Sequence, residues 1–125
     1  MKKTVIHTNH APAAVGPYAQ AILANGILAT SGQLGLIPET GELAPGTRAQ
    51  TAQSLRNLDA ILLEAGLERS DVIKTTVFLK DMGDFPVVNE IYELFFRENK
   101  PARSCVQVAK LPKDGLVEIE ILAVR

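Results

Sequence analysis

The sequence is poor in features that define several specialised classes of protein. Among its 125 residues are one cysteine, two histidines and no tryptophan. A lone Cys105 cannot form an internal disulfide, and the same count excludes zinc fingers. Disulfide-stabilised scaffolds are therefore excluded as well, and the cysteine usage agrees with a reducing compartment.

An excess of one charge and long apolar runs are missing too. Thirteen Lys and Arg residues face fourteen Asp and Glu residues, and the net charge is −1. This balance leaves no basic surface for a phosphate backbone, so we do not expect nucleic acid as a partner. No apolar run approaches the roughly 20 residues of a membrane span, and the N-terminus lacks the pattern of a secretory signal. We expect a cytoplasmic protein with no membrane partner.

The common catalytic motifs are also absent. The sequence contains no Gly-x-Gly-x-x-Gly, no phosphate-loop lysine motif and no His-Glu-x-x-His. His7 and His10 could coordinate a metal in principle, but a surface pair explains them better. Without a central histidine, a Ser-His-Asp or Cys-His mechanism has no base. Cys105 alone is more often a small buried hydrophobe than a nucleophile.

What is present predicts a single domain over residues 1–125. A chain of this size buries about two-thirds of its unfolded surface, and neither a repeat nor a linker divides it. Hydrophobic periodicity and turn residues predict two helices and six strands. The expected strands are 3–7, 18–24, 27–31, 72–80, 103–109 and 116–124, and the expected helices run from 47 to 65 and from about 84 to before Pro101.

Local signals set several of these boundaries. Asn25-Gly26 is the dipeptide most typical of a two-residue type I′ hairpin. Thr47 and Gln50 fit a capping box, and Asp84 fits an N-cap. Residues 32–46 hold four glycines and two prolines, which favours a loop.

The order of the elements predicts an α+β fold with a mixed sheet of about six strands and both helices on one face. In the last strand Val117, Ile119 and Ile121 alternate with Glu118 and Glu120, so the carboxylates point away from the helices. We expect the uncovered face to carry Thr, Ser, Cys, Gln and Glu among aliphatic residues. Such a face commonly packs against other copies of the chain.

Arg103 is the first candidate for chemistry. It follows Pro101-Ala102 at the start of a predicted strand, and its guanidinium could grip a carboxylate with two hydrogen bonds. The alternatives are an exposed edge-strand arginine or a structural ion pair with Glu118 or Glu120. Glu118 is similarly ambiguous, because an outward strand carboxylate is usually solvated, yet opposite an arginine it could orient water.

Four separated blocks carry a resemblance to a known family. They are Gly16-Pro17-Tyr18-Ala19-Gln20-Ala21, then Ser31-Gly32-Gln33, then Lys74-Thr75-Thr76-Val77-Phe78-Leu79-Lys80-Asp81, and finally Pro101-Ala102-Arg103-Ser104-Cys105-Val106-Gln107-Val108-Ala109, continued by Leu111-Pro112-Lys113-Asp114 and Val117-Glu118-Ile119-Glu120. Together they span essentially the whole chain, which resembles the RidA/YjgF family of reactive-intermediate deaminases.

The resemblance implies a chorismate-mutase-like fold and a homotrimer whose sheets line an inner barrel, with ligand clefts between subunits. The implied reaction is hydrolysis of 2-imino or 2-enamino acids, such as 2-iminobutanoate and 2-iminopropanoate, to 2-keto acids and ammonia, without cofactor or metal. Arg103 would hold the substrate carboxylate, the backbone N–H of Cys105 would add a hydrogen bond, and Glu118 would position or activate water. The cleft would be shaped by Tyr18, Ser31, Gly32 and Asn89, with Gln33 as a weaker member.

In the trimer we expect Arg103 and Glu118 of one chain to face Tyr18, Ser31 or Asn89 of a neighbour. Two other functions stay open. A non-catalytic sensor of 2-keto acids, or a chaperone-like protein, would use the same Arg103 cleft without turnover. The ribonuclease activity attributed to some relatives finds little support in a chain with a net charge of −1.

Overall fold

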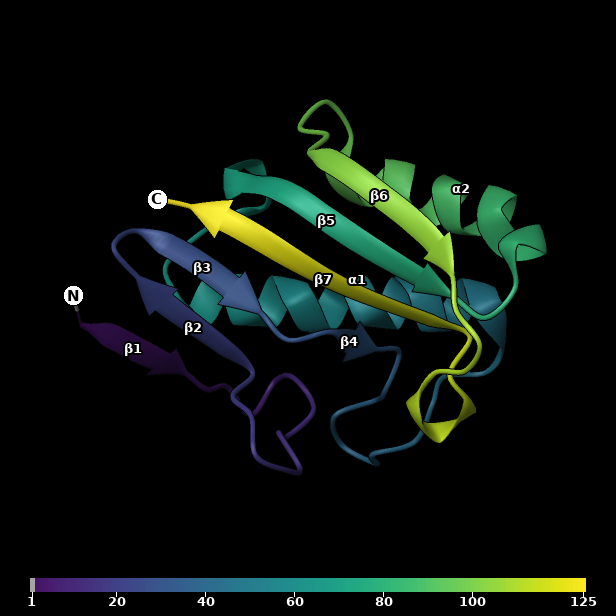
Figure 1. The fold of residues 1–125 in the computed structure, drawn as a ribbon, viewed down its shortest axis with the longest axis horizontal. Helices are drawn as coiled ribbons and strands as arrows, with labels where there is room; N and C mark the ends of the chain where they lie inside the picture. The colour runs from purple at the N-terminus through teal and green to yellow at the C-terminus, as the bar shows by residue number, and fades with distance from the viewer. Residues whose placement is uncertain (1) are drawn as a thin grey trace.

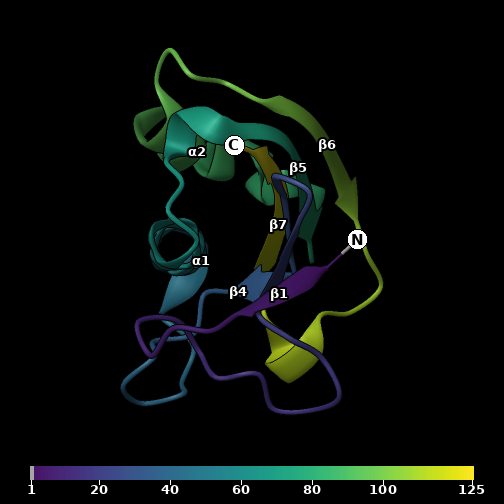
Figure 2. The same ribbon diagram turned by 90° about the vertical axis from the view of Figure 1, so that its left-hand side faces the viewer.

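A seven-stranded mixed sheet carries two helices on one of its faces in the computed structural model, which describes residues 2–125 (Figures 1 and 2). The sheet order is β1-β2-β3-β7-β5-β6, and β4 also pairs with β7. Strands β5 and β6 pair in parallel, and the other pairs are antiparallel. The strands are β1 (Lys3–Ile6), β2 (Ala21–Ala24), β3 (Ile27–Thr30), β4 (Gln33–Leu34), β5 (Val72–Leu79), β6 (Ala102–Gln107) and β7 (Val117–Val124), and the helices are α1 (Gly46–Glu64) and α2 (Phe85–Phe96). Among residues 2–125, neither helix has the apolar length that crossing a membrane requires.

The predicted hairpin is confirmed, but its first strand is shorter than expected. Asn25 and Gly26 have φ values of 54° and 78°, as a type I′ turn requires, and Ala24 pairs with Ile27. Strand β2 begins at Ala21 rather than at residue 18. The preceding Gln20 is buried, and its side chain forms hydrogen bonds with the backbone of Thr8 and Pro12 in the N-terminal loop.

The predicted capping box at the start of α1 is wrong. The helix begins at Gly46, and no side chain caps it. The Thr47 hydroxyl donates instead to Asp84 Oδ2 at 2.9 Å, and Gln50 Oε1 accepts from the Leu116 N–H at 2.9 Å. Asp84 does precede α2 as predicted, although its carboxylate bonds Thr47 rather than the helix. Contacts between distant segments therefore replace the local capping bonds.

Strand β4 lies within the segment that the sequence predicts as a loop. Polar side chains of α1 hold it: Ser54 Oγ donates to the Gln33 carbonyl at 2.7 Å, and Asn57 Nδ2 donates to the Leu34 carbonyl at 3.2 Å. A Cβ atom on Gly35 would lie 2.4 Å from the Gln50 carbonyl oxygen, so only glycine permits this approach. The glycine-rich segment thus follows the helix closely instead of forming a free loop.

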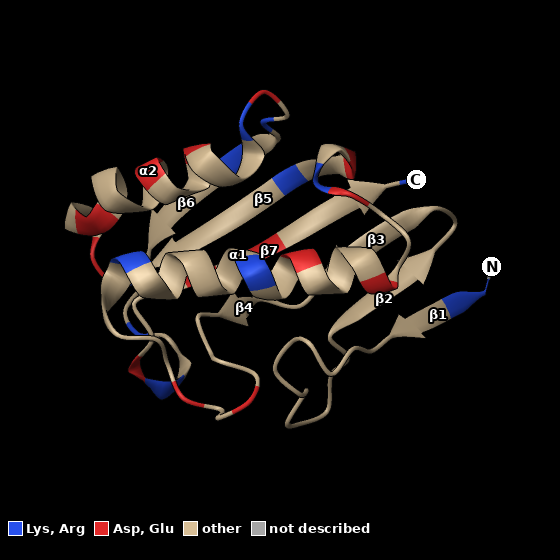
Figure 3. Ribbon diagram, turned by 180° about the vertical axis from the view of Figure 1, so that it is seen from behind, with Lys and Arg blue, Asp and Glu red and all other residues tan. Residues whose placement is uncertain are grey.

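The predicted alternation in β7 is confirmed. Val117, Ile119 and Ile121 are buried, whereas Glu118 and Glu120 are partly exposed on the other face. Figure 3 shows α1 and α2 lying together in front of the sheet. The opposite face, which no described helix covers, carries exposed aliphatic side chains on three strands: Ile27, Val106, Leu122 and Val124.

The residue types expected on the uncovered face need one correction. Cys105 and Gln107 pair with Val77 and Leu79 of β5, which are fully buried beneath the helices. Because side chains directly opposite each other in a ladder share a face, Cys105 and Gln107 belong to the helix-covered face. The parallel register of β5 and β6 sets this orientation, and alternation within β6 alone could not reveal it.

Candidate active site

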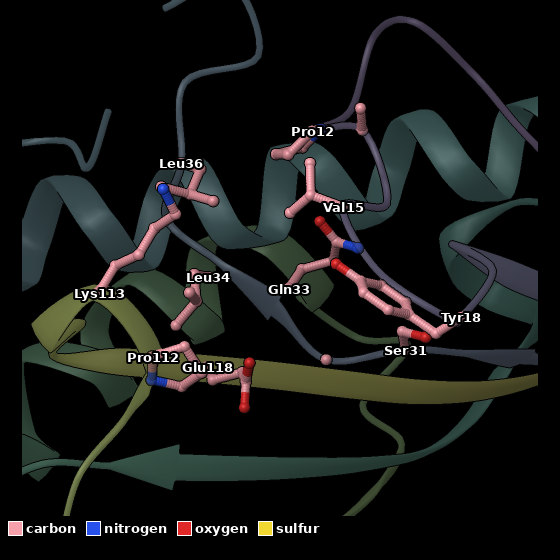
Figure 4. A pocket seen from close by; sticks show the side chains of 12 residues that line it. Pro12, Val15, Tyr18, Ser31, Gln33, Leu34, Leu36, Pro112, Lys113 and Glu118 are labelled. Atoms are coloured by element: carbon pink, nitrogen blue, oxygen red, sulfur yellow. The ribbon is translucent and has the colours of Figure 1, made fainter. Parts of the chain in front are cut away.

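Glu118 lies in a cleft of about 480 Å³ together with most of the predicted cleft residues. Its carboxylate projects from β7. The side chain of Tyr18 approaches from the loop before β2, and that of Ser31 approaches from the end of β3 (Figure 4). Gly32 and Gln33 also line the cleft. The structure therefore brings together five predicted site residues in one chain.

Backbone geometry fixes the residues around this carboxylate. The Ser31 hydroxyl donates to the Ala19 carbonyl at 2.6 Å, and the Ser31 N–H donates to the Gln20 carbonyl at 2.9 Å. A Cβ atom on Gly32 would lie only 2.8 Å from Glu118 Cδ. Glycine at this position leaves the room that the carboxylate occupies.

Glu118 is half-buried, and burial raises the pKa of its carboxyl group. The nearby Glu120 carboxylate raises this pKa further, because a second negative charge disfavours ionisation. Among the described residues, none of the ion pairs includes Glu118. A carboxylate whose pKa is raised is a stronger base, which suits it to accept a proton.

Sequence reasoning missed the far wall of the cleft. Lys113 and Pro112 face Leu34 and Leu36 there (Figure 4). Lys113 adopts a left-handed conformation with φ of 56°, which is uncommon for a residue other than glycine. The Leu111-Pro112-Lys113-Asp114 block, which is part of the family resemblance, is the sequence signal that points to this wall.

Arg103 lies in a second cleft of about 370 Å³, at the edge of the sheet. Its Nη1 donates to Asn89 Oδ1 at 2.7 Å. Its Cζ lies 4.9 Å from the centre of the Tyr92 ring and 5.2 Å from that of Phe85, within the range of cation–π attraction. Sequence reasoning found Asn89 but missed both aromatic residues, although all three lie three or four positions apart on one side of α2.

The alternative of a structural ion pair between Arg103 and Glu118 or Glu120 is wrong. Arg103 forms none of the ion pairs found among residues 2–125, and both glutamates lie on the opposite face of the sheet. The guanidinium thus keeps its full charge beside an open cleft. A planar cation in this state is suited to bind a carboxylate with two parallel hydrogen bonds.

Cys105 follows Arg103 on the same face of β6 and packs against the core. Burial raises the pKa of its thiol, and the positive charge of Arg103 partly opposes this effect. The side chain is thus held as a neutral thiol, which is a poor nucleophile. Within the described chain, no three His, Cys, Asp or Glu residues are placed to hold a metal ion.

The predicted site residues therefore form two groups in one chain. Tyr18, Ser31 and Gly32 accompany Glu118, whereas Asn89 accompanies Arg103. Contacts across an interface stay a prediction, but within one chain the expected proximity of Arg103 and Glu118 is replaced by a separation. Its physical cause is the register of the sheet, which turns Arg103 towards α2 and Glu118 towards the opposite face.

Comparisons with known proteins place this arrangement in a family. The family model described as Endoribonuclease L-PSP matches residues 8–125. The chain belongs to this family, the RidA/YjgF family. A RidA/YjgF relative from Escherichia coli K12, called 2-iminobutanoate/2-iminopropanoate deaminase, is 52% identical over 100% of this chain and 99% of its own. A RutC family protein from Pasteurella multocida is 54% identical over 97% of both chains.

Solved structures of the RidA/YjgF family share the fold. The crystal structure of the Escherichia coli YjgF gene product has a TM-score of 0.94 and 50% identity, covering 98% of each chain. That of Escherichia coli TdcF with bound serine has a TM-score of 0.94 and 47% identity, also covering 98% of each chain. The α+β fold and the family resemblance inferred from the sequence are confirmed.

Proposed function

We propose that this protein is a 2-iminobutanoate/2-iminopropanoate deaminase, which hydrolyses reactive 2-imino acids to 2-keto acids and ammonia. The observation that carries the proposal is the 52% identity, over the full chain, to a deaminase of this name. The two clefts supply matching chemistry: an arginine with an uncommitted charge for the substrate carboxylate, and a half-buried carboxylate for water.

In the proposed mechanism Arg103 binds the carboxylate of the protonated imine. Glu118 orients a water molecule and accepts a proton from it as the oxygen attacks the imine carbon. Glu118 then returns this proton to the nitrogen of the resulting carbinolamine, so that ammonia can leave. The hydroxyl proton passes to the Glu118 carboxylate as the C=O bond forms, which yields the 2-keto acid. A protonated imine is already electrophilic, so orientation and modest acid–base help are sufficient.

We propose that the complete site forms between copies of the chain, in a homotrimer. Arg103 and Glu118 point away from opposite faces of one sheet, so a small substrate meets both only if they come from different chains. The exposed aliphatic residues on the same face of the sheet as Glu118, among them Val106 and Leu122, supply an apolar surface for such an interface. The number of copies, three, rests on the family resemblance.

The test generates the imine with a serine or threonine dehydratase and follows its disappearance with and without the protein. We expect faster imine loss and 2-keto acid formation in its presence, and loss of this effect in Glu118→Gln. The sensor alternative predicts binding of 2-oxobutanoate without faster imine loss. That outcome would overturn the deaminase proposal.

The family description also raises RNA cleavage as a second function. A net charge of −1 gives little electrostatic attraction for a phosphate backbone. Incubation with RNA at several salt concentrations tests this function, and we expect no cleavage. Cleavage that Arg103→Ala abolishes would favour the ribonuclease instead.

A further inference from the structure

Arg103 is held by groups that leave its charge intact. Asn89 accepts one hydrogen bond from it, and the rings of Phe85 and Tyr92 lie beneath the guanidinium. An acidic partner would hold the side chain equally well but would compete with a substrate carboxylate. Aromatic faces and an amide oxygen attract the cation without neutralising it.

The Tyr92 ring is itself anchored in the core. Its hydroxyl lies 2.8 Å from Thr75 Oγ1, and both residues are buried, with exposed fractions of 6% and 0%. Thr75 is also the residue directly opposite Arg103 in the β5–β6 ladder. Thr75, Tyr92 and Arg103 therefore each contact the other two. Strand pairing joins Thr75 to Arg103, a hydrogen bond joins Thr75 to Tyr92, and the cation–π contact joins Tyr92 to Arg103.

Burial raises the pKa of the Tyr92 phenol, although the Thr75 hydrogen bond and the charge of Arg103 oppose the shift. The phenol therefore stays neutral, and either hydroxyl of the Thr75–Tyr92 pair can donate to the other. A phenylalanine at this position would fill the same volume but would lack the bond that prevents the ring from tilting. A valine at position 75 would likewise preserve shape and remove the hydroxyl.

We propose that Thr75 and Tyr92 are positioning residues for Arg103. The hydrogen bond between their hydroxyl groups fixes the Tyr92 ring, which the Arg103 guanidinium contacts. This inference rests on the proposed function. A bidentate grip requires the guanidinium plane to match the carboxylate plane, so a tilted ring misaligns the fork. Arg103 binds the carboxylate in both the ground state and the transition state, so the loss falls on KM rather than on kcat.

The experiment measures imine kinetics and 2-oxobutanoate affinity for Tyr92→Phe, Thr75→Val and Thr75→Ser. We expect the first two variants to raise KM and the 2-oxobutanoate Kd about three- to tenfold, with kcat within about twofold, as one lost hydrogen bond permits. Thr75→Ser keeps the hydroxyl and should stay near wild type. Ile61→Val, a fully buried change in α1, controls for lost stability and should leave KM unchanged.

A second background separates positioning from a general structural role. The Arg103→Lys variant has no planar guanidinium to align. If the Tyr92 ring acts by aligning the guanidinium, adding Tyr92→Phe to Arg103→Lys should change KM by less than about 1.5-fold. An equal effect of Tyr92→Phe in both backgrounds, or an unchanged KM in Tyr92→Phe and Thr75→Val, overturns the inference. Failure of the proposed function gives a different result, because the wild-type protein itself would then leave the rate of imine loss unchanged.

Discussion

Arg103 and Glu118 lie on opposite faces of one sheet. Arg103 pairs with Thr75 of β5, which is buried beneath the helices, and Glu118 pairs with Phe78 of the same strand. Positions 75 and 78 are three residues apart, so their side chains point to opposite sides of the strand. The strands β6, β5 and β7 lie side by side in Figure 1, so the separation arises from orientation and not from distance along the sheet.

Replacing Arg103 tests the carboxylate grip. Arg103→Ala should lower kcat/KM for the imine at least about a hundredfold, because two charge-assisted hydrogen bonds are lost. Arg103→Lys should recover little, since a point charge cannot reproduce the planar fork. Arg56→Ala on α1, where the guanidinium bonds Gln53, is the control and should keep its activity. Near wild-type kinetics in Arg103→Ala would refute the assignment.

The two glutamates of β7 should behave differently. Glu118→Gln should lower kcat about 10²- to 10⁴-fold, because it removes the group that we propose activates water, whereas Glu120→Gln should retain turnover. Equal losses in the two variants would remove the reason for assigning the role to Glu118.

The pH profile supplies a further test of this pair. In the proposed mechanism Glu118 acts as a carboxylate, so activity should fall as the pH drops through its raised pKa. Glu120→Gln removes the like charge that helps to raise this pKa, so the acidic limb of kcat/KM should move to lower pH. A limb that stays in place or moves upward would contradict the electrostatic coupling.

Gly32→Ala should impair catalysis without unfolding the protein. The added Cβ would lie 2.8 Å from Glu118 Cδ, so the carboxylate must move away. We expect kcat to fall about tenfold or more, as for a misplaced acid–base group. Gly41→Ala is the matched control: its φ of 73° makes alanine strained, but it lies in an open turn. The control should lower the melting temperature and leave kcat/KM intact, and the opposite pattern would be inconsistent with the close contact.

Mixing two inactive variants tests the shared site. Arg103→Ala and Glu118→Gln trimers, unfolded and refolded together, should regain about a quarter of wild-type activity, because random assembly joins the two intact residues in that share of the interfaces. Each variant refolded alone should stay inactive. A mixture that remains inactive would show that Arg103 and Glu118 of one active site come from the same chain.

The apolar face offers an independent check of the assembly. Leu122→Glu places a charge on the uncovered face and should yield inactive monomers by light scattering. Leu63→Glu, on the exposed side of α1, is the control and should leave both size and activity unchanged. A monomer with full imine-hydrolysing activity would contradict the shared site.

Periodicity in the sequence was enough to predict the elements that are regular and local. The Asn25-Gly26 turn and the alternation of β7 both depend on residues close together in the chain. Signals that required a choice between partners were misleading. Thr47 and Gln50 had local partners available, yet they bond Asp84 and Leu116, which lie far along the sequence.

The sequence by itself determined the family, the two helices, the faces of β7 and the identity of the candidate residues, because motif, spacing and alternation are properties of neighbouring positions. Only the tertiary structure decided which residues share a cleft. The register between β5 and β6 turns Arg103 towards the aromatic side of α2, and β4 places Leu34 opposite Glu118. These orientations depend on pairings between distant segments, whose register is fixed only when the helices and the sheet pack together.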